Sequence, residues 1–140
     1  MADRRPRGQS AFWDDFARDL ADPEFLREYV VESVRIATID QLVNDLDDAR
    51  VAAGLSKADL ARAISAQPAS IRRLFTSGNA SPTLGTVAEV AAALGMRVTL
   101  EPLPTAEREQ VTTSLLEGRA KNPKALAKLL DRKRRVREAS

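Results

Sequence analysis

The chain has 140 residues, of which 22 are Lys or Arg and 20 are Asp or Glu, so its net charge at pH 7 is only +2. It has no cysteine and no histidine, which excludes disulfides, metal sites built on those residues, and Ser-His or Cys-His catalysis. No long apolar run and no signal-peptide pattern is present, so we expect a cytoplasmic protein with no membrane-spanning segment. The length fits one domain with appendages, or at most one and a half domains.

The first segment, residues 1–21, combines an arginine-rich arm with a short aromatic helix. The arm is either a solvated terminus or a DNA-contacting extension. After it, Phe12, Trp13 and Phe16 share one helical face with Leu20. So short a helix is not stable alone in water, so we expect it to dock on the body of the protein, on a second copy or on another protein.

An acidic helical extension is predicted over residues 22–37, beginning at Asp22-Pro23. Two alternatives are open for the residues after it. Apolar residues at helical spacing extend the pattern as one long helix that ends at Gly54. Alternatively, Thr38 begins a new helix, because Thr38 and Gln41 have the form of a capping box. In either case the second half of this stretch supplies the first helix of the next domain.

Three short helices are predicted between Leu55 and Leu94. The first begins after Ser56, which forms a potential capping box with Asp59. It presents an apolar face made of Leu60, Ala61 and Ile64. A tight joint at Ser65-Ala66 ends this helix, so the next helix must cross it rather than extend it.

The second short helix has Gln67 as its cap and Pro68 as its first residue, where the missing N–H costs nothing. It is predicted to bury Ile71 and Leu74. It leaves three polar side chains outward: Ser70, Arg72 and Arg73. Ser77-Gly78-Asn79 ends it, because Gly and Asn tolerate a left-handed turn.

The third short helix is capped by Ser81 or Thr83. Its predicted apolar stripe consists of Leu84, Val87, Ala88, Ala91 and Leu94. Gly95 ends it, and Met96–Glu101 then alternates apolar and polar residues, which predicts a short strand with one buried face. No other strand is evident in the sequence, so the simplest partner is the same strand of a second copy, paired antiparallel by two-fold symmetry.

A basic helical tail is predicted over residues 102–140. Pro102 and Pro104 separate it from the strand, and helices are expected over Thr105–Glu117 and from Asn122-Pro123 onward. Residues 105–140 hold ten bases against five acids. The run Arg132–Arg137 is either a solvated tail, a DNA backbone contact, or a contact with an acidic partner or a membrane.

The stretch from Leu55 to Gly95 resembles the lambda-repressor-like helix-turn-helix of the Cro/CI or Xre type. The matching residues are Leu55, Ser56, Asp59-Leu60-Ala61, Ile64, Ser70-Ile71, Arg73-Leu74, Pro82, Leu84, Thr86-Val87 and Ala93-Leu94-Gly95. The chain departs from the family at Lys57, where Gln is usual, at Ser65, where Gly is usual, and at Phe75, where Glu is usual. The resemblance implies an all-α bundle over residues 38–101, with the strand following the last helix of the domain.

The resemblance also implies a DNA-binding surface on the second short helix. That helix fits the major groove, and Arg73 is expected to read guanine. The other residues that we assign to DNA are Ser56, Lys57, Gln67, Pro68, Ala69, Ser70, Arg72 and Asn79. Lys57, Arg72 and Asn79 are expected on the phosphate backbone, Gln67 and Ser70 on bases or phosphates, and Ala69 on a thymine methyl.

Three functions are compatible with these features. The strand and the acidic extension resemble parts of HigA- and HipB-type antitoxins, which implies a dimeric bacterial repressor that binds a cognate toxin and represses its own promoter. The alternatives are a stand-alone Xre-type or phage-like regulator, and a protein-interaction module without DNA binding. We expect no enzyme activity, metal or cofactor, because no glycine-rich phosphate loop or catalytic constellation is present.

Overall fold

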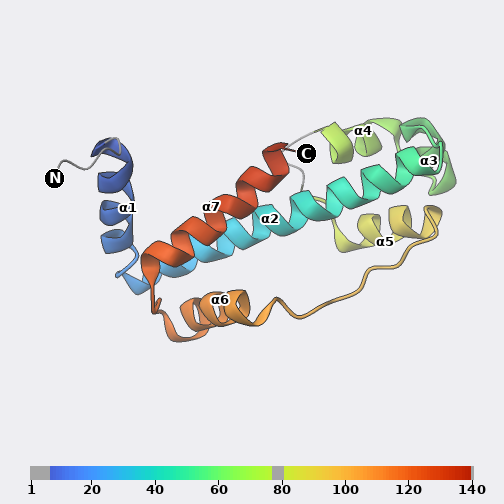
Figure 1. Cartoon of the computed structure of the whole chain (residues 1–140). Coiled ribbons are helices and arrows are strands. Elements are labelled where there is room, and N and C mark those ends of the chain that lie inside the picture. Colours follow the sequence, from blue (N-terminus) through green and yellow to red (C-terminus); the bar gives the residue numbers. More distant parts are fainter. Residues whose placement is uncertain (1–6, 77–80, 140) are drawn as a thin grey trace. The chain divides into compact units, whose positions relative to one another are not determined.

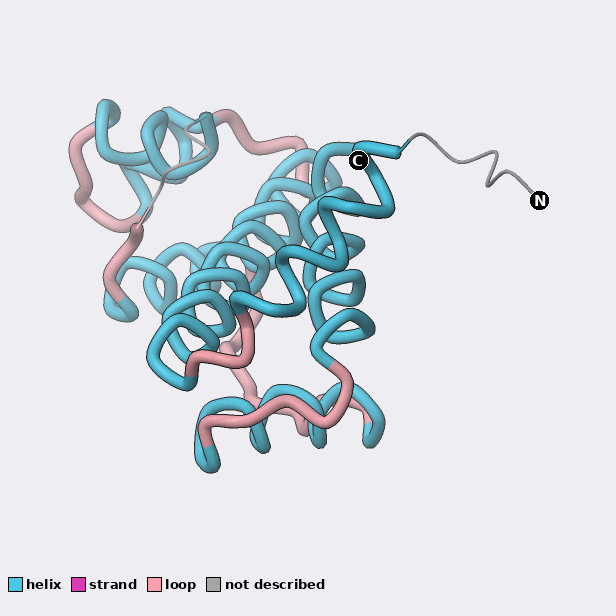
Figure 2. Tube along the Cα trace, turned by 90° about the vertical axis from the view of Figure 1, so that its left-hand side faces the viewer, coloured by secondary structure: helices cyan, strands magenta, loops and turns pink. Residues whose placement is uncertain are grey.

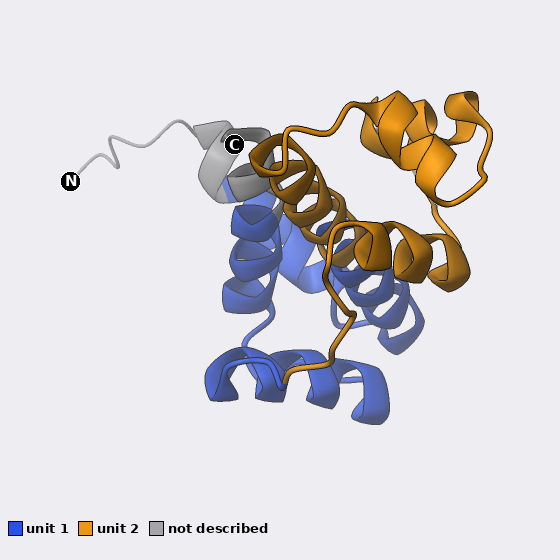
Figure 3. Ribbon diagram, turned by 90° about the vertical axis from the view of Figure 1, so that its right-hand side faces the viewer, with its two compact units in different colours: residues 1–37, 102–140 blue, residues 38–101 orange. Residues whose placement is uncertain are grey.

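The computed structural model describes residues 7–76 and 81–139, and within them it contains seven helices and no strand (Figures 1 and 2). The chain divides into two compact units, which are coloured separately in Figure 3. Unit 1 consists of residues 1–37 and 102–140, and unit 2 of Thr38–Glu101. Each unit has its own buried apolar cluster.

Unit 1 is built from four helical pieces that come from both ends of the chain. They are α1 (Arg7–Asp19), the first half of α2 (Pro23–Ala52), α6 (Thr105–Glu117) and α7 (Pro123–Ala139). Their shared core buries Leu20, Leu26, Val30, Val111, Leu126, Ala127 and Leu130. The flanking segments of the sequence therefore pack against one another rather than forming separate appendages.

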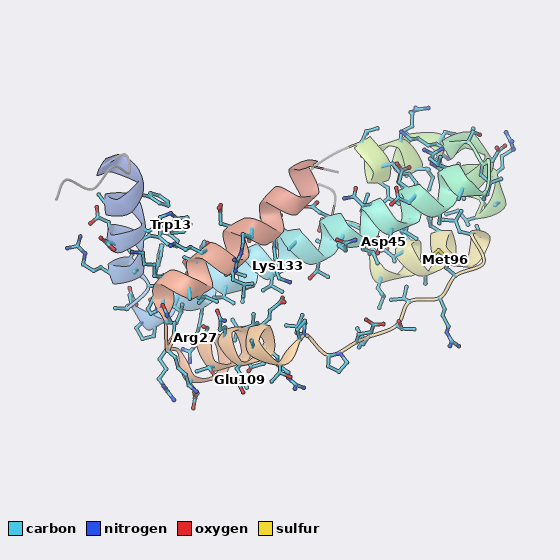
Figure 4. All side chains as sticks on the ribbon, viewed as in Figure 1. Trp13, Arg27, Asp45, Met96, Glu109 and Lys133 are labelled. Atoms are coloured by element: carbon cyan, nitrogen blue, oxygen red, sulfur yellow. The ribbon has the colours of Figure 1, made fainter. Side chains whose placement is uncertain are left out.

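The aromatic helix α1 docks on the body of the protein, which was one of three options open from sequence. Trp13 and Phe16 pack against the unit 1 core, and Figure 4 shows Trp13 on α1. Phe16 meets Tyr29 of α2 edge to face, with 4.7 Å between the ring centroids. Lys124 of α7 also donates to the Asp14 carboxylate of α1 at 3.0 Å. These contacts supply the burial that a helix of this length needs.

The α6–α7 joint is fixed by Gly118, which takes a left-handed φ of 68°. A Cβ at this position would also lie 3.0–3.2 Å from Arg27 and Pro23 of α2, so a larger residue would meet both strain and crowding. Arg27, labelled in Figure 4, donates from its Nε to the backbone oxygen of Leu115 in α6 at 3.1 Å. The next helix is capped by the Asn122 side chain, which accepts from the Ala125 N–H at 3.0 Å.

The helix α2 is continuous from Pro23 to Ala52, so the alternative that placed a new helix start at Thr38 is wrong. A capping role would require Thr38 to leave helical geometry. Apolar residues at helical spacing on both sides of it are instead buried, with Leu26 and Val30 in unit 1 and Leu46 in unit 2. The burial of both halves favours an unbroken helix over a local cap.

Unit 2 consists of the second half of α2, followed by α3 (Lys57–Ala63), α4 (Pro68–Thr76) and α5 (Leu84–Ala93). Its core buries Leu46, Leu60, Ala61, Ile71, Leu74, Val87, Val90 and Ala91. Thr83 rather than Ser81 caps α5, since its hydroxyl accepts from the Thr86 N–H at 3.1 Å. The predicted stripe on α5 is partly wrong, because Leu84 is 73% exposed while Val90 is fully buried.

The strand predicted over Met96–Glu101 is not formed, and residues 96–104 have no regular secondary structure. The predicted buried face is also wrong for the single chain, since Met96, Val98 and Leu100 are all exposed. A strand needs a partner for its ladder of N–H and C=O groups, and the described part of the chain contains no other strand. Pairing with a second copy stays a prediction.

Candidate nucleic-acid interface

The first helix of the candidate interface, α3, begins with a complete capping box. The Ser56 hydroxyl accepts from the Asp59 N–H at 3.0 Å, and the Asp59 carboxylate accepts from the Ser56 N–H at 2.8 Å. These hydrogen bonds satisfy donors that a helix N-terminus leaves without partners. The bond from the Ser56 N–H is the main reason why the pKa of Asp59 lies below its usual value, and the Ser56 hydroxyl and Arg62 add to the effect.

The joint between α3 and α4 depends on a backbone conformation that serine adopts at a cost. Ser65 has a φ of 54°, and it is the only non-glycine residue with positive φ in residues 7–76 and 81–139. The Ala66 N–H then donates to the Ala61 oxygen at 2.8 Å, which closes the turn. The chain thereby reverses direction within a few residues and α4 packs against α3.

One face of α4 anchors the helix and the other is exposed. Ile71 is fully buried and Leu74 is 4% exposed, as predicted from their spacing. The exposed residues of α4 and of the position before it include Gln67, Pro68, Ala69, Ser70, Arg72 and Arg73. Neither Arg72 nor Arg73 forms an ion pair with any residue whose structure is described. Both guanidinium groups are therefore available for an external anion.

The remaining predicted residues have different environments. Lys57 is the first residue of α3 and is partly exposed. Ser56 is exposed, but its hydroxyl is already an acceptor within the capping box, so its first role is structural. Asn79 lies outside the described residues. Unit 2 therefore presents the predicted residues on α4 and at the start of α3, which are two neighbouring helices.

Arg50 is a residue of this region that the sequence did not single out. Its Nη1 donates to the Leu55 oxygen and its Nε to the Asp47 carboxylate, both at 2.9 Å. Its guanidinium carbon also lies 5.7 Å from the ring centroid of Phe75 in α4. The Arg50 side chain is only 16% exposed. It therefore ties the end of α2 to the following turn and to α4.

The contact with Arg50 gives Phe75 a structural role. The Phe75 ring is partly buried against the unit 2 core. The ring therefore packs on another segment of its own chain. No sequence signal joins Arg50 to Phe75, because the two lie 25 positions apart and on different helices.

Comparisons of the chain with protein-family models, with curated proteins and with solved structures gave no significant match. Among the described residues, no helix is both long enough and apolar enough to cross a membrane.

Proposed function

We propose that unit 2 binds a DNA operator through α4 and that the protein is a transcriptional repressor. The main support is that α4 is anchored by Ile71 and Leu74 while the guanidinium groups of Arg72 and Arg73 stay exposed. A helix held in this way presents a rigid rod of the width that the major groove admits. Residues 51–80 hold four bases against one acid, which favours approach to phosphate.

In this proposal the exposed residues of α4 divide into two roles. Arg73 reads a guanine through O6 and N7, while Gln67, Ser70 and Ala69 contact neighbouring base edges. Arg72 and Lys57 contact phosphates and fix the orientation of the helix. Two copies, paired through residues 96–101, would present two such helices to a palindromic site.

The test is a gel-shift titration of the promoter fragment upstream of the protein's own gene. Arg73→Ala should weaken specific binding by about 1–3 kcal/mol. Arg108→Ala is a matched control, because Arg108 is exposed on α6 in unit 1. An unchanged affinity of the Arg73→Ala variant would overturn the assignment of α4 and favour a protein-interaction module instead.

We further propose that the protein is the antitoxin of a toxin–antitoxin pair. The alternative is a stand-alone regulator that binds no toxin, and one observation favours it. The flanking helices bury their apolar residues in a core of their own, so their packing does not by itself require a toxin. Co-expression with the product of the adjacent gene distinguishes the two candidates. A stoichiometric complex after purification supports the antitoxin, and its absence supports the stand-alone regulator.

A further inference from the structure

Unit 1 carries a repeated pattern of aromatic and acidic residues on its first two helices. In α1, the exposed Phe12 is followed by acids three and seven positions later, Asp15 and Asp19. In α2, Phe25 is followed at the same spacing by Glu28 and Glu32. Because residues three, four and seven apart share one side of a helix, each phenylalanine lies on the same side of its helix as two carboxylates. We call these six residues the acidic aromatic face.

The two halves of this face are joined by the aromatic residues four positions after each phenylalanine. Phe12 stacks on Phe16 with 5.8 Å between ring centroids. Phe16 in turn contacts Phe25 at 6.0 Å and Tyr29 at 4.7 Å, in both cases edge to face. The rings therefore form one continuous row across α1 and α2, and all of them belong to unit 1.

The ends of that row are exposed to solvent. Phe12 is 56% exposed and Phe25 is 37% exposed, although both are large apolar side chains. Phe16 and Tyr29 are half-buried between them and hold the row in place. Aromatic residues, phenylalanine among them, are enriched at protein interfaces relative to the rest of the surface.

The charge around the rings limits what can cover them. Residues 11–32 hold seven acids against two bases. Asp15 is paired with Arg18 and Glu32 with Arg35 on the same helix, whereas Asp19 and Glu28 form no ion pair with a described residue. DNA is excluded by repulsion between carboxylates and phosphates. A second copy meeting this face through two-fold symmetry would place acids against acids.

We propose that the acidic aromatic face is the docking surface for a basic protein partner, with an apolar pocket for each exposed phenylalanine and Lys or Arg around it. This proposal rests on the antitoxin function, and the partner is then the product of the adjacent gene. The basic partner supplies cations for Asp19 and Glu28. None of the six residues of this face is among those assigned to the operator.

The experiment measures the affinity of the full chain for the purified product of the adjacent gene by isothermal titration calorimetry. The variant Phe12→Ala/Phe25→Ala removes both exposed rings. It should bind at least about 100-fold more weakly, as expected when two aromatic anchors are lost. Leu116→Ala is the matched control, because Leu116 is an 80% exposed apolar residue on α6 of the same unit. It should bind like the unchanged protein.

The charge is tested separately with Asp19→Asn/Glu28→Gln, measured at several salt concentrations. This variant should bind more weakly and with a flatter salt dependence, since surface charge acts mainly through long-range attraction. The control is Glu109→Gln/Glu117→Gln on α6, which removes two exposed acids elsewhere in unit 1. Circular dichroism and the fluorescence of Trp13, the single tryptophan, confirm that each variant is folded.

Operator binding by the same proteins separates this proposal from the proposed function. Failure of the unchanged protein to bind the operator would overturn the repressor function, whether or not a complex with the partner forms. Intact operator binding with no complex, or a complex that the ring and charge variants leave unaltered, would overturn the docking surface alone. Sedimentation that shows the ring variant losing self-association would assign the face to a second copy and overturn the basic partner.

Discussion

The positive φ of Ser65 predicts that Ser65→Gly will stabilise unit 2. An L-residue in the left-handed region costs roughly 1–2 kcal/mol, and Ser65 has a φ of 54°. Glycine removes that cost, but it also lowers the free energy of unfolding by about 0.5–1 kcal/mol because it gives the unfolded chain more conformational freedom. Taking the middle of each range, the expected net increase in the free energy of unfolding is about 0.75 kcal/mol. For a unit of this size that corresponds to a melting temperature roughly 2–8 °C higher.

Urea unfolding of the full chain measures this effect with two signals. Circular dichroism at 222 nm follows the helices of both units, whereas tryptophan fluorescence follows unit 1, because the single tryptophan is Trp13. Ser65→Gly should move the part of the dichroism transition that belongs to unit 2. If the units unfold independently, the fluorescence midpoint should stay where it is.

Ser81→Gly is the matched control for this substitution. Ser81 is also an exposed serine in a loop of unit 2, but its φ is not positive. Glycine there gains freedom in the unfolded chain without relieving strain, so stability should stay the same or fall slightly. The contrary result is that Ser65→Gly leaves the urea midpoint of unit 2 unchanged or lowers it, while the slope of the free energy of unfolding against urea concentration stays the same. That result would show that the turn is not strained and would refute the reasoning.

Other parts of the chain give three further predictions. Asp59→Asn should lower the free energy of unfolding at neutral pH but not at acid pH. The pKa of Asp59 is lowered in the folded state, so the stability that its carboxylate contributes is present above the ordinary aspartate pKa and is lost as the pH falls through the folded value. Unfolding measured at several pH values should show the stabilities of the two proteins becoming equal at acid pH. Val98→Pro should give monomers by light scattering if residues 96–101 pair between copies, because proline cannot donate to a ladder; a dimer that persists would exclude that pairing. Lys128→Gln/Arg132→Gln should flatten the salt dependence of operator binding if α7 contacts phosphates. Both residues are exposed, so this variant avoids the loss of core residues that deleting α7 would cause. An unaltered dependence of affinity on salt concentration would place α7 away from the DNA.

Patterns of neighbouring residues were enough to predict several helix starts and one turn of unit 2. The capping box at Ser56, the proline start of α4 and the cap at Thr83 all form as those patterns indicate. A tight joint at Ser65-Ala66 was also predicted, and the turn forms there. These features depend on hydrogen bonds and backbone angles that span at most a few residues, so the sequence nearby contains the information that fixes them.

Features that depend on distant contacts became clear only from the folded chain. Thr38 had the form of a cap, but burial on both sides of it kept α2 continuous. On α5, helical spacing allowed several apolar stripes, and packing chose the one that includes Val90 rather than Leu84. The contact of Arg50 with Phe75 and the assembly of both chain ends into unit 1 join residues far apart in sequence. Their energies come from surfaces brought together by folding, which no local pattern records.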